Sequence, residues 1–132
     1  MEIMEQLKSE LALRIPGLED EIKRYKSSFA DDFVYAFEWY AEPMYKSEME
    51  LRALRKIAEK AETMSADEIA VMLDEWIERM EDDLLDGTLQ GKSTSETKNI
   101  AHTWNLEEEQ RLRAMFVRWK KDIAEVNKIE KG

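Results

Sequence analysis

The sequence predicts an all-α fold: a single domain over residues 1–132, built as an antiparallel bundle of about five helices. Only 4 glycines and 2 prolines occur, too few for the many turns of a β-sandwich or barrel. Hydrophobic residues, 43% of the chain, recur three or four positions apart through most of its length. Helix start and stop signals divide these stretches from one another.

The first two expected helices lie on either side of Pro16-Gly17. An apolar stripe predicts a helix over residues 2–14, which this pair should end. A second stripe predicts a helix over residues 19–41 that stops before Pro43, with Ile22, Tyr25, Phe29, Phe33, Ala36 and Tyr40 as members. Residues 33–40 are apolar almost all round, a composition that also suits a strand. The helical period on both sides of this segment favours a helix.

Three more helices are expected in the rest of the chain. A weaker stripe predicts one over residues 44–62. Ser65 and Glu68 form a capping box that starts the next, which should end near Gly87. Residues 87–99 form a polar loop, although the Ser-Thr-Ser-Glu segment at 93–96 could cap a short helix. Asn105 and Glu108 start the last helix, with Leu112, Met115, Phe116, Trp119, Ile123 and Val126 on its stripe.

The charge balance constrains the choice of partner. Thirty acidic residues stand against 20 basic ones, a formal charge of -10. This surplus disfavours nucleic acid and anionic membranes as direct partners and favours a basic protein. The chain has no cysteine, which excludes disulfides and thiolate chemistry. No secretory signal and no apolar stretch long enough to span a bilayer are visible, so we expect a cytoplasmic protein.

The evidence for an enzyme is weak. The single histidine, His102, has Asn99 three residues before it, so the Glu-x-x-His pair of di-iron bundles is missing and we assign His102 no role. The acids around Trp76 resemble the Glu-Glu-x-x-Glu element of all-α nucleotide pyrophosphohydrolases, whose inward carboxylates hold magnesium. No second carboxylate pair follows, and the helical wheel puts these acids opposite the apolar stripe. A metal-dependent hydrolase is therefore the least favoured reading, and we expect no catalytic residue, metal or cofactor.

Acidic residues are concentrated between Ser65 and Gly87. Nine occur there against Arg79 alone, a local charge of -8, although like charges one turn apart repel. They are Asp67, Glu68, Asp74, Glu75, Glu78, Glu81, Asp82, Asp83 and Asp86. Solubility is one explanation. Our leading hypothesis is a non-enzymatic inhibitor that presents these carboxylates as a nucleic-acid mimic and blocks a basic, nucleic-acid-binding surface of a partner.

Tyr35 and Trp39 suggest a second binding surface. On the helical wheel both lie outside the main stripe of the helix expected over residues 19–41. Either that helix is central and covered on all sides, or the two rings meet a partner, since aromatic residues are favoured interface anchors. The alternative function is therefore a homo-oligomeric assembly or adaptor module, in which a second copy of the chain binds this patch and the acids only maintain solubility.

Overall fold

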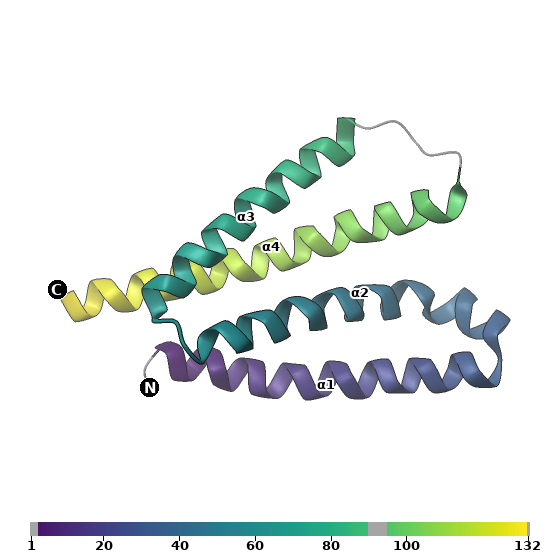
Figure 1. The fold of residues 1–132 in the computed structure, drawn as a ribbon, viewed down its shortest axis with the longest axis horizontal. Helices are drawn as coiled ribbons and strands as arrows, with labels where there is room; N and C mark the ends of the chain where they lie inside the picture. The colour runs from purple at the N-terminus through teal and green to yellow at the C-terminus, as the bar shows by residue number, and fades with distance from the viewer. Residues whose placement is uncertain (1–2, 90–94, 132) are drawn as a thin grey trace.

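The structure is a computed structural model that describes the backbone of residues 3–89 and 95–131 and the side chains of residues 3–82 and 95–126. Over these residues the chain forms four helices and no strand: α1 (Ile3–Asp31), α2 (Phe33–Ala61), α3 (Ala66–Leu89) and α4 (Glu96–Lys131). Figure 1 shows α1 and α2 as one hairpin and α3 and α4 as another. The expected all-α fold is confirmed, but the described helices number four rather than about five.

The expected break at Pro16-Gly17 is wrong, because α1 runs through it. Proline inside a helix removes one hydrogen bond and costs about 3 kcal/mol. Leu11 and Leu18 are buried on the two sides of Pro16, and Ile22 follows one turn later on the same face. Because each such burial contributes about 1.5–3 kcal/mol, this face outweighs the cost of the proline. Gly17 does not adopt a positive φ, so it does not end the helix either.

The first reversal of the chain instead lies at Asp32. This residue has an extended backbone (φ -148°, ψ 95°), and its carboxylate accepts a hydrogen bond of 3.1 Å from the amide of Tyr35, which caps α2. Residues 33–40 are helical, as the period predicts. The expected stop before Pro43 is wrong. The helix expected over 19–41 is divided at Asp32 between α1 and α2, and the helix expected over 44–62 is the second half of α2.

The starts of α3 and α4 show one prediction confirmed and one corrected. Ser65 and Glu68 form the expected capping box: the amide of Ser65 donates to Glu68 Oε1 at 3.1 Å, and the amide of Glu68 donates to Ser65 Oγ at 3.2 Å. Asn105 does not start a helix, because α4 already begins at Glu96, where Ser95 Oγ accepts from the amide of Lys98 at 3.3 Å. The loop expected over 87–99 is helical at both ends, and residues 90–94 lie outside the described part.

A hydrophobic core joins all four helices. Its most deeply buried apolar side chains are Leu54, Ile57, Ile69, Leu73 and Phe116. On α1 the buried core ends at Ile22, and on α2 it begins at Leu51. Both helices nevertheless continue from these residues to the turn at Asp32. The α1–α2 hairpin therefore extends well beyond the apolar core that it helps to form.

Three of the four tryptophans, Trp39, Trp76 and Trp119, should differ in their contribution to stability. Trp119 is 5% exposed and contacts Phe116, whereas Trp76 is only partly buried and Trp39 is exposed. Trp119→Ala should lower the free energy of unfolding by about 3–5 kcal/mol. The loss should be smaller for Trp76→Ala and under about 1 kcal/mol for Trp39→Ala. Urea titration followed by circular dichroism measures all three, and equal losses would contradict this packing.

Candidate functional site

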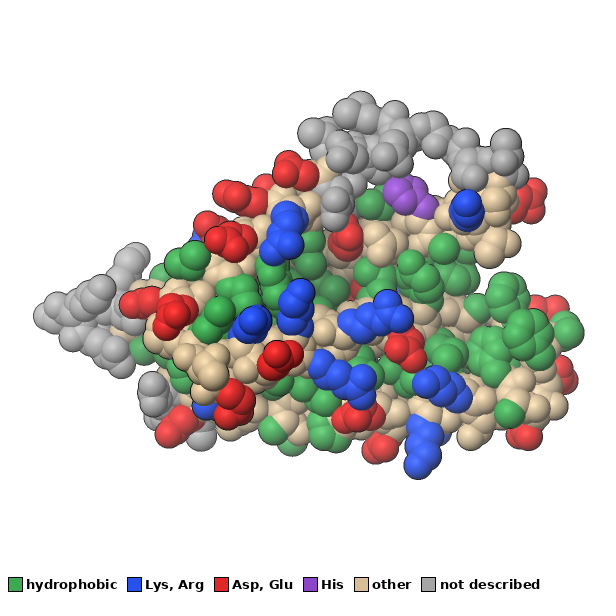
Figure 2. All heavy atoms as spheres, in the orientation of Figure 1, with side chains coloured by type: hydrophobic (Ala, Val, Ile, Leu, Met, Phe, Trp, Pro, Cys, Tyr) green, Lys and Arg blue, Asp and Glu red, His purple; other side chains and the backbone are tan. Residues whose placement is uncertain are grey.

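Among the side chains that the structure describes, most of the exposed large hydrophobic residues lie at the turn between α1 and α2. We call it the aromatic tip and define it as Phe33, Val34, Tyr35, Phe37 and Trp39, which are 51–67% exposed. Figure 2 shows hydrophobic side chains gathered over this end of the molecule. The expectation that α2 is covered on all sides is therefore wrong here, and Phe33, which was expected on the buried stripe, is exposed.

The rings of the tip and its neighbours form two rows. In the first, Phe33 contacts Phe29 and Phe37, with ring centroids 5.7 and 6.0 Å apart. In the second, Tyr35 contacts Trp39 at 6.4 Å and Tyr40 at 6.3 Å. The rings restrain one another, so their exposed faces form an ordered surface.

Tyr25 of α1 extends the second row. Its ring stacks on that of Tyr40 with centroids 5.4 Å apart, and its hydroxyl donates to Glu21 Oε1 at 2.7 Å. Burial, together with this hydrogen bond, raises the pKa of Tyr25 to about 12. The hydroxyl therefore remains protonated near neutral pH and holds the ring of Tyr25 against Tyr40.

Only acidic charges lie close to the aromatic tip in the sequence. Residues 27–42 contain four carboxylates, Asp31, Asp32, Glu38 and Glu42, and no lysine or arginine. Asp32 caps α2, and Glu42 pairs with Lys46 at 3.2 Å. Asp31 and Glu38 are exposed and take part in no ion pair found among the described residues. The tip thus combines aromatic rings with unpaired negative charge.

The acidic face of α3 is partly occupied by contacts within the molecule. Asp74 pairs with Lys120, and Glu81 pairs with Arg113, which ties α3 to α4. Glu68 belongs to the capping box, and Asp67 is exposed and also engaged in an interaction. On the described part of α3, the exposed acids that make no ion pair or hydrogen bond are Glu75, Glu78 and Asp82. The side chains of Asp83 and Asp86 lie outside the described residues.

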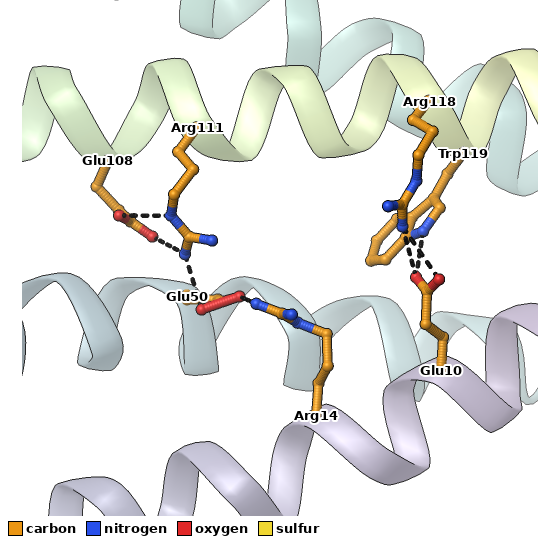
Figure 3. Close-up of polar contacts among 7 residues, drawn as sticks. All are labelled: Glu10, Arg14, Glu50, Glu108, Arg111, Arg118 and Trp119. Carbon is orange, nitrogen blue, oxygen red and sulfur yellow. Dashed lines mark hydrogen bonds and ion pairs between the residues drawn. The ribbon is translucent and has the colours of Figure 1, made fainter.

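Buried charge is concentrated where α1, α2 and α4 meet (Figure 3). The carboxylate of Glu50, on α2, lies between Arg14 of α1 and Arg111 of α4, and the distance from Arg111 Nη2 to Glu50 Oε2 is 2.7 Å. Arg111 also donates to Glu108 through Nε at 3.1 Å. Glu50 is 3% exposed and Glu108 is 2% exposed. We call these four side chains the buried ion cluster.

The buried ion cluster is saturated rather than reactive. The hydrogen bonds to Glu108 raise the pKa of Arg111, and those to Glu50 raise it further. Both carboxylates are thus held by permanently charged guanidinium groups that are themselves about half exposed. The chemistry of this arrangement is that of a cross-link between helices. Sequence analysis missed it, although Glu50 and Glu108 each stand four residues before a leucine of the apolar stripe, Leu54 and Leu112.

The described residues offer neither a metal site nor a membrane-spanning helix. Within the described residues, no three His, Cys, Asp or Glu side chains are grouped so that they could hold a metal ion. His102 lies exposed on α4. None of the helices, over the residues searched, is both long and apolar enough to cross a membrane.

Comparisons with known proteins add no information about function. No protein-family model matches the chain, and neither the curated proteins nor the solved structures gave a match.

The buried ion cluster generates a stability prediction. Glu50→Ala should lower the free energy of unfolding by about 1.5–3 kcal/mol, because Arg14 and Arg111 lose charge-assisted hydrogen bonds to a buried carboxylate. The matched control is Glu19→Ala, since Glu19 pairs with Arg55 at 2.9 Å between the same two helices but at the surface. That control should cost less than about 1 kcal/mol. Chemical denaturation measures both, and similar losses would contradict the structural role of Glu50.

Proposed function

We propose that this protein is a non-enzymatic interaction protein that docks on a partner protein through the aromatic tip of an antiparallel helical bundle. The observation that carries the proposal is the exposure of Phe33, Tyr35, Phe37 and Trp39 at one end of the hairpin. An aromatic side chain has about 150–250 Å² of surface, so the exposed parts of these four amount to about 450 Å². The largest apolar patch of an ordinary monomer is about 300–600 Å² and is often functional.

The position of the tip also supports docking. Exposed aromatic side chains add nothing to the core, and they increase the risk of aggregation. Four of them within seven residues, ordered by mutual ring contacts, are more than the scatter of single apolar residues found on any surface. The absence of cysteine from the sequence supports a reducing compartment such as the cytoplasm for this role.

A second candidate function uses α3. Glu75, Glu78 and Asp82 are exposed and lie within two turns of one helix, which supports the hypothesis of an acidic decoy for a basic, nucleic-acid-binding surface. The pairs Asp74–Lys120 and Glu81–Arg113 reduce the charge available for this purpose. We therefore rank the decoy below the aromatic tip.

The aromatic tip should be required for binding to the physiological partner. Wild type, Trp39→Ala and Phe37→Ala serve as baits in extracts of the cell of origin, and each protein retained is then purified and its Kd measured. Either substitution should weaken the Kd of the true partner about tenfold or more, as removal of an interface anchor does. Val71→Ala is the control, because Val71 is equally exposed but lies on α3. Equal affinity for all four proteins would refute the proposal.

The decoy hypothesis makes a different prediction. Replacing Glu75, Glu78 and Asp82 by lysine reverses the charge of the exposed face and leaves the ion pairs of Asp74 and Glu81 intact. A decoy should then lose most of its affinity for its partner at low salt, mainly through slower association. Surface plasmon resonance measures the association rate. An unchanged rate at low salt would leave α3 as a solubilising surface.

A further inference from the structure

The aromatic tip continues into a groove along α2. Phe33, Phe37, Ala41 and Tyr45 are four residues apart, so they form one continuous ridge that is inclined to the axis of the helix. Next to them lies an open groove of about 540 Å³, lined by Ala41, Met44, Tyr45, Glu48, Met49 and Asn105, with Arg52 at the end farther from the tip. From Phe33 to Met49 the helix rises by about 24 Å. The surface therefore has the length of an amphipathic helix of about 16 residues.

The charges near this surface favour a basic partner over a second copy of the chain as its occupant. A second copy of the chain, docked tip to tip, would bring together two sets of four carboxylates with no lysine or arginine from residues 27–42 on either side. Asp31 and Glu38 have no ion-pair partner in the described structure, so their charges are not compensated within the molecule. Like charges at an interface are unfavourable, whereas a basic partner would complement them.

The rings favour the same kind of partner. Lysine and arginine side chains are attracted to the faces of tryptophan, tyrosine and phenylalanine, and their alkyl stems cover apolar surface. The same contact occurs within the molecule, where Lys56 Nζ lies 5.7 Å from the centroid of the Trp76 ring. A helix with apolar residues on one face and basic residues beside them would thus satisfy the rings, the groove and the carboxylates together.

We propose that the row from Phe33 to Tyr45 and the adjoining groove bind a basic amphipathic helix of the partner protein, with its basic residues next to Asp31 and Glu38. This inference rests on the proposed function and specifies the chemistry of the partner. Phe37 lies on the bound row, whereas Trp39 lies on the other row of rings. The two positions therefore separate this inference from the broader proposal that the tip docks.

The test uses two dye-labelled model peptides of about 16 residues with identical leucine positions, one with lysine and one with glutamate elsewhere. Fluorescence anisotropy measures the Kd of each for the full-length protein. The lysine peptide should bind and the glutamate peptide should not. Phe37→Ala should weaken binding about tenfold, and Phe37→Leu, which keeps an apolar side chain, should restore most of it. Trp39→Ala should have the smaller effect.

The charge requirement is tested with matched double variants. Asp31→Asn with Glu38→Gln should weaken binding of the lysine peptide about fivefold at low salt. Glu75→Gln with Glu78→Gln removes the same charge from α3 and should change the Kd less than about twofold. An equal effect of the two doubles would overturn the inference, because the peptide would then respond to the overall charge rather than to the tip.

Three further outcomes would also overturn it. Equal binding of the glutamate peptide would show that the partner is not basic, while the docking role of the tip would stand. Self-association of the protein alone in sedimentation equilibrium, abolished by Phe37→Ala, would identify a second copy as the occupant. Pelleting with neutral phosphatidylcholine vesicles, also abolished by Phe37→Ala, would identify a membrane. Failure of the proposed function itself is separate, because it requires that neither Trp39→Ala nor Phe37→Ala affects the physiological partner.

Discussion

The arrangement of the two hairpins depends on the burial of Glu50 and Glu108. Burying an unpaired carboxylate is costly, and each of these is matched by guanidinium groups whose outer atoms reach water. The matching requires Arg14 of α1 and Arg111 of α4 to meet Glu50 of α2. A shift of any of the three helices by one turn would separate these charges, so the buried ion cluster restricts the register more than interchangeable apolar contacts do.

The position of this cluster along α2 is also related to the exposure of the aromatic tip. Glu50 immediately precedes Leu51, where the buried core of α2 begins. Closer to the tip, α2 and α4 meet through the surface pair Lys46–Glu107 at 2.8 Å and the ring contact of Tyr45 with Trp104, whose centroids are 5.8 Å apart. The fully buried core therefore ends near the buried ion cluster, and beyond it the hairpins meet only through partly buried or exposed side chains.

The sequence predicted correctly that the chain is helical and which stripes form most of the core, but the predicted ends of the helices were wrong. Pro16 and Pro43 were read as stops, although the apolar stripe keeps its phase across each of them. The phase was the better signal: at Pro16 a buried face several turns long outweighs the loss of one hydrogen bond, and at Pro43 the half-buried Tyr40 and Met44 continue the stripe. Asp32 separates α1 from α2, and aspartate is one of the residue types favoured at the N-cap of a helix. Its capping bond to Tyr35 is local and could have been predicted.

The candidate surfaces were predictable to different degrees. The helical wheel placed Tyr35 and Trp39 outside the stripe, and the structure leaves both exposed. The wheel also put the acids of α3 opposite the core, but it could not show that Asp74 and Glu81 pair with α4. Pairing between helices far apart in sequence depends on the tertiary arrangement. The same holds for the groove beside Tyr45, to which Asn105 of α4 contributes.

The acidic surplus opposes the self-association that the exposed rings of the aromatic tip would otherwise favour. A monomer that exposes about 450 Å² of aromatic surface is prone to bind copies of itself, and the aromatic rings alone would not prevent this. A formal charge of -10, with Asp31 and Glu38 beside the rings, makes every encounter between two tips repulsive. On the proposed function, the same field would attract a basic helix and raise its rate of association. The charge that α3 carries without an ion pair need not then be a binding site, because it would act through its contribution to this field.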